Sequence, residues 1–232
     1  MKSTMRKAGS KTQEAPRQSL VRRLWYRFIR ATCYLAAKIL FRFRSLDSNQ
    51  VPDTGSLLLL SNHQSHLDPV LVGIGTRRPV CSLARQTLFD TPGLSWLIRS
   101  LDAIPIDRDG FGLAGLKETL RRLRHDEAVL LFPEGRRSDD GQLATLKPGV
   151  CSLARRGRAT LVPVGIDGAF EAWPRRRRLP RPGRITICYG EPIGPETVAE
   201  CSDSELLDLL SERIRDCQAS ARARRQSNRD LP

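Results

Sequence analysis

One histidine and one aspartate stand five residues apart in a chain that has only three histidines. His63 and Asp68 are part of the run Asn-His-Gln-Ser-His-Leu-Asp at residues 62–68. An alcohol is a poor nucleophile at neutral pH, so its acylation requires a base with a pKa near 7. A carboxylate behind an imidazole sets its tautomer and stabilises the imidazolium. The pair is a candidate general base with its orienting acid, although a histidine that only hydrogen-bonds within a turn is the commoner explanation of this spacing.

A metal site and a serine nucleophile are two alternative chemistries. His63, His66 and Asp68 could bind a metal, but a catalytic zinc site needs three protein ligands with outer-shell support. The remaining histidine, His125, lies in a polar stretch typical of a solvated helix face. The run Gly-Leu-Ser-Trp-Leu at 93–97 lacks the second glycine of a nucleophile elbow. We therefore expect neither a metal site nor a covalent enzyme intermediate.

A second candidate loop is Phe-Pro-Glu-Gly-Arg-Arg-Ser at residues 132–138, directly after an apolar run. Gly135 would let a ligand approach the backbone, and Arg136 and Arg137 offer planar donors suited to phosphate. Arg108 ends another apolar run and could either cap a strand edge or bind a phosphate. An ordinary strand-to-loop turn is the plain alternative.

A glycine pattern at residues 110–115 satisfies G-x-G-x-x-G between an expected strand and an expected helix. Asp107 and Asp109 precede its first glycine, where the tight turn should begin, and two acids there would repel a pyrophosphate. Dinucleotide binding therefore stays a minor alternative.

The elements that must position these loops follow from short apolar runs alternating with helical segments. Strands are expected at 57–60, 80–84, 103–106, 128–132, 160–166 and 184–189, and helices at 68–76, 93–100, 112–125, 149–156 and 203–225. The alternation predicts an α/β domain with a mostly parallel central sheet flanked by helices. Chemistry in such sheets collects beyond the carboxyl ends of strands, where both candidate loops lie.

The chain divides by composition into four segments. Residues 1–16 are expected to be a disordered basic tail, 17–46 an amphipathic helix or helical hairpin, 47–220 the catalytic domain, and 221–232 a disordered tail. Leu20, Leu24 and Phe28 recur at helical spacing with Arg23 and Arg27 between them. This pattern indicates contact with an anionic membrane surface through residues 17–44, although a helix packed on its own domain is commoner.

No apolar stretch reaches the roughly 18 residues of a membrane span, and no cleavage pattern of a signal peptide is present. We therefore expect a peripheral or monotopic protein on the cytoplasmic face of the cell membrane. The six cysteines are scattered without a C-x-x-C pair, which is typical of reduced thiols in a cytosolic setting.

The net charge of +14 favours an anionic partner without choosing among nucleic acid, anionic lipid and an acidic carrier. Residues 174–184 form an arginine-rich loop that could meet a carrier protein, coenzyme A phosphates or lipid, or could be merely solvated.

Four ordered blocks of sequence resemble those of the glycerolipid acyltransferases, best known as 1-acylglycerol-3-phosphate acyltransferases. They are residues 62–68, residues 104–108 (Ile-Pro-Ile-Asp-Arg), residues 132–138 and residues 161–166 (Leu-Val-Pro-Val-Gly-Ile). The resemblance covers about residues 50–190 and leaves both termini outside it.

The resemblance implies that His63 and Asp68 are the catalytic H-x4-D pair. It also implies that Arg108 holds the acceptor's phosphate and that Glu134 and Gly135 help to position that acceptor. The implied reaction moves a fatty acyl group from acyl-CoA or acyl carrier protein, as co-substrate, to a lysophospholipid hydroxyl. The acceptor expected first is 1-acylglycerol-3-phosphate, which would give phosphatidic acid. No bound cofactor is expected.

Two departures from the family pattern concern the acceptor. Arg136 stands where the family usually has threonine, and Asp102 stands where glycine is common. Another lysolipid acceptor is therefore the main alternative. A basic nucleic-acid-binding protein is a further alternative, but it leaves the His63/Asp68 loop unexplained, so no nucleic acid is expected as a partner.

Overall fold

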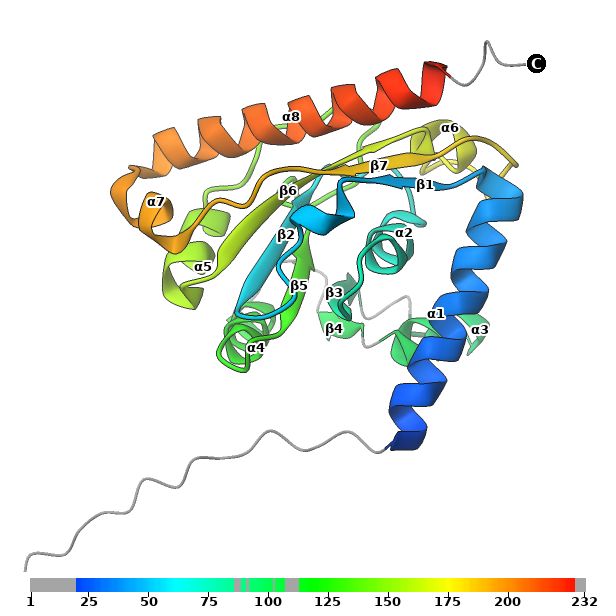
Figure 1. Ribbon diagram of the computed structural model, residues 1–232, viewed down its shortest axis with the longest axis horizontal. Helices are drawn as coiled ribbons and strands as arrows, with labels where there is room; N and C mark the ends of the chain where they lie inside the picture. Colours follow the sequence, from blue (N-terminus) through cyan, green and yellow to red (C-terminus); the bar gives the residue numbers. More distant parts are fainter. Residues whose placement is uncertain (1–19, 86–88, 91, 102, 107–112, 228–232) are drawn as a thin grey trace, which may run out of the picture.

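The computed structural model describes residues 20–85, 89–90, 92–101, 103–106 and 113–227. A seven-stranded sheet lies between two groups of helices (Figure 1). Its strands are β1 (Arg44–Leu46), β2 (Leu57–Ser61), β3 (Val80–Arg85), β4 (Ile104–Ile106), β5 (Ala128–Leu131), β6 (Thr160–Asp167) and β7 (Thr186–Tyr189). The order is β1-β7-β6-β2-β5-β3-β4, and all neighbouring strands are parallel except β6 and β7. The predicted α/β class with a mostly parallel sheet is confirmed.

The helices cover both faces of the sheet. They are α1 (Leu20–Phe41), α2 (Asp68–Gly75), α3 (Pro92–Ser100), α4 (Leu113–Leu123), α5 (Gly149–Gly157), α6 (Ala169–Ala172), α7 (Pro195–Glu200) and α8 (Asp203–Ser227), with a short 3-10 turn η1 (Ser48–Gln50). In β2, Leu57 and Leu59 pack with α1, α2 and α6, whereas Leu58 and Leu60 pack with α4, α5, α7 and α8. Burial on both faces explains why this strand is apolar at every position but its last.

Helix α8 lies closely against β6. Gly165 permits this approach, because a Cβ atom there would lie 2.0 Å from the backbone nitrogen of Gln218. The buried Asp167 carboxylate pairs with Arg222 at 3.2 Å and also with Arg225. Residues 221–227 are therefore helical, whereas the sequence predicted that a disordered tail begins at residue 221.

Helix α1 is a single continuous helix rather than a hairpin. It ends at Phe41, where Arg42 takes a left-handed φ of 42°. Residues 44–46 then form β1 and pair with β7, so they belong to the sheet and not to the N-terminal segment that was predicted to extend to residue 46. The sequence analysis missed β1 because three residues are too short to give a strand pattern.

Apolar side chains lie on both the packed side and the exposed side of α1. Ile29 and Ala37 are buried against the domain, whereas Leu24 and Phe28 are exposed. Arg30 folds onto the end of α2 and donates to the carbonyl oxygen of Arg77 at 3.0 Å. None of the helices within the described ranges is long and apolar enough to cross a bilayer.

Candidate active site

Two loops meet at one edge of the sheet. Strands β2 and β5 are parallel neighbours with Leu60 opposite Leu131, so the segments that follow them leave the same edge. The backbone N–H of Ser138 donates to the carbonyl oxygen of His63 at 2.7 Å and joins the two segments. The topology therefore brings together the His63 loop and the Glu134 loop, as the sequence predicted.

His63 and Asp68 are in direct hydrogen-bond contact. The His63 Nδ1 atom lies 2.8 Å from Asp68 Oδ2. The same oxygen accepts from the backbone N–H groups of Gln64 at 2.6 Å and Ser65 at 2.7 Å. Asp68 is fully buried in the first turn of α2, where the helix dipole favours a negative charge. A carboxylate so held fixes the proton on Nδ1 and leaves Nε2 as the basic nitrogen.

The His63 ring is also fixed from its face. It stacks on the Phe132 ring with a centroid distance of 3.9 Å and an interplanar angle of 17°. The side chain keeps 18% of its surface exposed, whereas Asp68 keeps none. The imidazole of His63 is thus accessible to a substrate, whereas the carboxylate of Asp68 is buried. Phe132 was not predicted as a site residue, and its position directly before Pro133 was the only signal.

Glu134 faces the backbone of its own site. Its Oε1 atom accepts from the His63 N–H at 2.7 Å, and Oε2 accepts from the Ala144 N–H at 2.9 Å. Burial raises the pKa of this carboxyl to about 7, although both hydrogen bonds act in the opposite direction. The carboxylate that was expected to position the acceptor therefore holds the loop that carries His63.

Gly135 and Lys147 form the neighbouring surface. Gly135 has a φ of 72°, and a Cβ atom there would lie 2.6 Å from Lys147 Nζ. The lysine backbone N–H donates to the carbonyl oxygen of Pro133 at 2.9 Å, which ties it to the same loop. No sequence motif includes Lys147, which lies twelve positions beyond Gly135, so it was not predicted.

The predicted arginines differ in their surroundings. Arg136 is exposed and lies 3.6 Å from Asp139. Arg137 is near His66, and its charge adds to burial in lowering the pKa of His66 to about 4, so this imidazole is neutral at pH 7. Arg108 lies outside the described residues, as do Asp102, Gly110 and Gly112.

Buried amides lock the His63 loop to the rest of the domain. Asn62 donates to the Ile166 carbonyl at 2.9 Å and accepts from the Ile166 N–H at 2.7 Å. Gln64 donates to the Gly141 carbonyl at 2.7 Å and accepts from the Phe170 N–H at 3.2 Å. These bonds join residues about 80 to 100 positions apart, so no local pattern could have revealed them. Within the described ranges, no cluster of three metal-ligating side chains is present.

The chain is similar to known acyltransferases over most of its length. The sequence model of the family described as Acyltransferase matches residues 42–167. A 1-acyl-sn-glycerol-3-phosphate acyltransferase of Bacillus subtilis is 24% identical over 78% of this chain and 91% of its own length. One of Pseudomonas aeruginosa is 29% identical over 76% and 70%.

A solved structure is also similar to this chain. The crystal structure of the 1-acyl-sn-glycerophosphate (LPA) acyltransferase PlsC from Thermotoga maritima superposes with a TM-score of 0.74. It is 25% identical, and the match covers 86% of this chain and 80% of that one. Since the family match spans more than half of the chain, the protein is an enzyme of the Acyltransferase family.

Proposed function

We propose that the protein is an O-acyltransferase that moves a fatty acyl group from an acyl thioester to the free hydroxyl of a lysophospholipid. The acceptor proposed first is 1-acylglycerol-3-phosphate, and the product is then phosphatidic acid. The observation that carries the proposal is the His63–Asp68 contact at 2.8 Å, which supplies a base at the edge of an acyltransferase domain. The names of the relatives support the choice of acceptor.

The chemical step follows from this geometry. His63 Nε2 takes the proton of the acceptor hydroxyl as its oxygen attacks the thioester carbonyl carbon. The C–O bond forms, the C–S bond breaks, and the imidazolium returns the proton to the departing thiolate. Asp68 stabilises the imidazolium in between. The donor is acyl-CoA or acyl carrier protein, bound as a co-substrate, and the proposed step uses no metal or bound cofactor.

Cationic side chains of this region suit the acceptor's phosphate. Lys147 lies beside Gly135, Arg137 acts electrostatically on His66, and the family resemblance assigns Arg108 to the same role. The absence of a side chain at Gly135 leaves room for the Lys147 ammonium group, which could bind the phosphate there. Glu134 acts in this proposal as a positioning residue for His63, because both of its oxygens are taken by backbone donors.

An apolar groove lies beside α2, the helix that begins at Asp68. Its lining includes Tyr26 of α1, Pro69 and Gly73 of α2, and Ile98 and Leu101 at the end of α3. Because Pro69 follows Asp68 directly, a fatty chain in this groove would end near the dyad. The apolar lining suits part of a hydrocarbon chain.

The exposed face of α1 supports a peripheral or monotopic seat on an anionic membrane, which we assign to the cytoplasmic face. Its outward side chains are large and apolar, and Trp25 also meets the exposed Trp96 of α3 at a ring distance of 5.7 Å. The exposed large apolar and aromatic residues of α1 are Leu20, Val21, Leu24, Trp25, Phe28, Tyr34, Leu35, Ile39 and Leu40. Apolar and aromatic side chains of this kind insert at the headgroup boundary.

A direct assay tests the proposed function. Purified protein is incubated with labelled acyl-CoA or acyl carrier protein and a panel of lysophospholipids in detergent micelles, and the products are identified by mass spectrometry. We expect acylation of 1-acylglycerol-3-phosphate, abolished by His63→Ala and unchanged by His125→Ala, whose histidine is exposed at the far end of α4. A product from another lysolipid alone would reassign the acceptor, and transfer by the His63→Ala variant would reject the mechanism.

A further inference from the structure

The arginine-rich loop at residues 174–184 is the strongest concentration of charge that the proposed function does not use. It contains six arginines and no acidic residue. Arg176 and Arg178 are exposed, and between the arginines Leu179 keeps 73% of its surface exposed. Pro180 and Pro182 follow, and their fixed φ angles limit how far the loop can collapse. A single exposed leucine is common on protein surfaces, so Leu179 gains its significance from the arginines around it and from the apolar helix face beside the loop.

Hydrogen bonds hold both ends of this loop. Trp173 Nε1 donates to the Arg177 carbonyl at 3.0 Å, and the Arg181 N–H donates to the Ala172 carbonyl at 2.8 Å. Hydrogen bonds between the two ends of the loop therefore give it a defined conformation. Its base lies on α6 and its tip carries Leu179.

The loop adjoins the end of α1. The Gly183 N–H donates to the Leu40 carbonyl at 3.1 Å, and the Ile185 N–H donates to the Phe41 carbonyl at 2.9 Å. Ile39, in the same turn of α1, is 70% exposed. The cationic loop therefore continues the exposed apolar face of α1.

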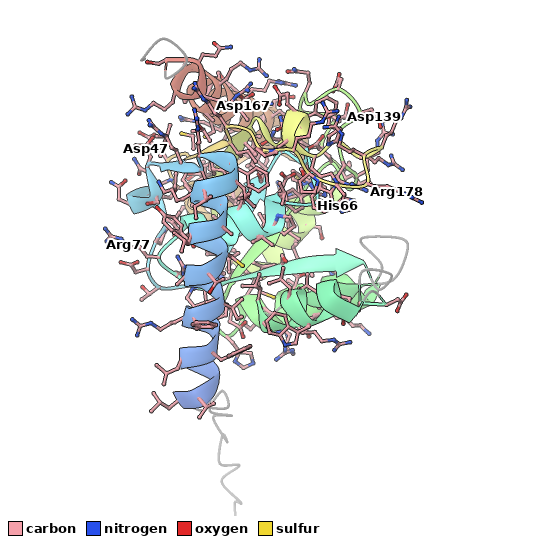
Figure 2. All side chains as sticks on the ribbon, turned by 90° about the vertical axis from the view of Figure 1, so that its right-hand side faces the viewer. Asp47, His66, Arg77, Asp139, Asp167 and Arg178 are labelled. Atoms are coloured by element: carbon pink, nitrogen blue, oxygen red, sulfur yellow. The ribbon has the colours of Figure 1, made fainter. Side chains whose placement is uncertain are left out.

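The loop also borders the candidate active site. The Trp173 ring lies 5.2 Å from the His66 ring, and Arg175 lies 3.8 Å from Asp139 of the neighbouring loop. Figure 2 shows His66, Asp139 and Arg178 on the same side of α1, with Asp47 and Arg77 on the other. The start of the arginine-rich loop therefore lies next to the two segments that form the site.

We propose that residues 175–182 make a second contact with the anionic bilayer. Arg176 and Arg178 meet the lipid phosphates, and Leu179 enters the interfacial layer. This inference rests on the proposed membrane seat of α1. A bilayer surface presents anionic groups above an apolar layer, which matches arginines placed around an exposed leucine and next to an apolar helix face. An acidic protein partner would match the arginines alone. A membrane contact beside the site would orient it toward lipid substrates.

Vesicle sedimentation of the full chain tests this contact. Wild-type protein and the Arg176→Gln/Arg178→Gln variant are compared on vesicles of phosphatidylglycerol and phosphatidylcholine, and on phosphatidylcholine alone, over a salt series. The matched control is Arg156→Gln/Arg215→Gln, which removes the same charge from exposed positions on α5 and α8. Leu179→Ser is measured in parallel.

We expect the loop variant to partition about 10- to 30-fold more weakly onto anionic vesicles, because each arginine near such a surface strengthens binding about three- to fivefold. The salt dependence of binding should also become shallower. The control should bind like wild type, and Leu179→Ser should weaken binding several-fold. Unchanged binding of the loop variant would overturn the inference. If the variant then also showed a raised KM for acyl-CoA or acyl carrier protein, the loop would be assigned to binding of the donor. Transfer in detergent micelles tests the proposed function separately, since it needs no bilayer.

Discussion

The two loops at the carboxyl edge of the sheet use their polar residues in opposite ways. After β2, the side chains of Asn62, Gln64 and Asp68 turn inward and bond to backbone, and the loop presents His63. After β5, the glutamate turns inward, but Arg136 extends into solvent. A rigid loop that presents one base suits the chemical step, whereas exposed cations suit capture of an anionic acceptor. Substitutions in the first loop, and of Glu134 that bonds to it, should therefore lower kcat, whereas substitutions of the exposed cations should raise the acceptor KM.

His63→Ala should have the largest effect. Removing the general base should lower kcat by about 10³- to 10⁴-fold. The thermal midpoint should change little, because the ring packs mainly on Phe132. Turnover and a melting curve measured on the same preparation check both points. A kcat within tenfold of wild type would remove His63 from the mechanism.

Asp68→Asn should lower kcat by about 10³-fold with little change in either KM. The amide oxygen can still accept from the Gln64 and Ser65 N–H groups, so the loop should persist. A neutral side chain cannot stabilise the imidazolium as a carboxylate does. Steady-state kinetics provide the measurement, and a loss expressed mainly in KM would show that Asp68 serves binding instead.

Arg108→Ala should raise the acceptor KM by about 10- to 100-fold and leave kcat nearly unchanged, as expected for a charged hydrogen bond to phosphate. An acceptor without a phosphate monoester serves as the control. The variant and wild type should have equally high KM values for this acceptor. Equal losses on both acceptors would indicate that Arg108 does not recognise the phosphate.

Glu134→Gln should lower kcat by about tenfold and leave the acceptor KM within about twofold, because the carboxylate bonds to the His63 N–H rather than to substrate. A raised acceptor KM with normal kcat would restore Glu134 to the acceptor site.

The same variant should change the pH dependence of stability. The Glu134 pKa is raised from 4.5 to about 7, so the folded protein binds the proton more tightly than the unfolded chain does. Stability from this group is fully present below pH 4.5 and is lost as pH rises through about 7, by about 3 kcal/mol. Urea unfolding at about pH 5 and about pH 8 should show this decline in wild type and a smaller one in Glu134→Gln. Equal declines would assign the titration to another group.

Arg136→Gln should have the smallest effect, about two- to threefold in acceptor KM. Its side chain is 65% exposed, and its pairing with Asp139 at 3.6 Å is screened by solvent. Arg136→Lys keeps the charge and should behave like wild type. A tenfold or larger rise in KM for Arg136→Gln would place this arginine in direct contact with the acceptor.

Sequence patterns predicted the sheet well where strands are buried on both faces. The apolar run at 57–60 became β2, and the run at 160–166 became β6 with one further residue. They failed where an element is short or its environment is tertiary. β1 has three residues, and α8 extends to Ser227 because Arg222 and Arg225 pair with Asp167 from a distant strand.

For the site, local motifs were enough to predict the candidate dyad and the class of protein, because His63, Asp68 and the other ordered blocks are short stretches of sequence. The use of the remaining residues depends on how the chain folds. The tertiary structure directs Glu134 to the His63 backbone, brings Lys147 to Gly135 and places Trp173 beside His66. It also turns Phe28 outward and Ile29 inward on one helix. Such contacts join positions far apart in the chain, and which apolar face a domain buries depends on what packs against it.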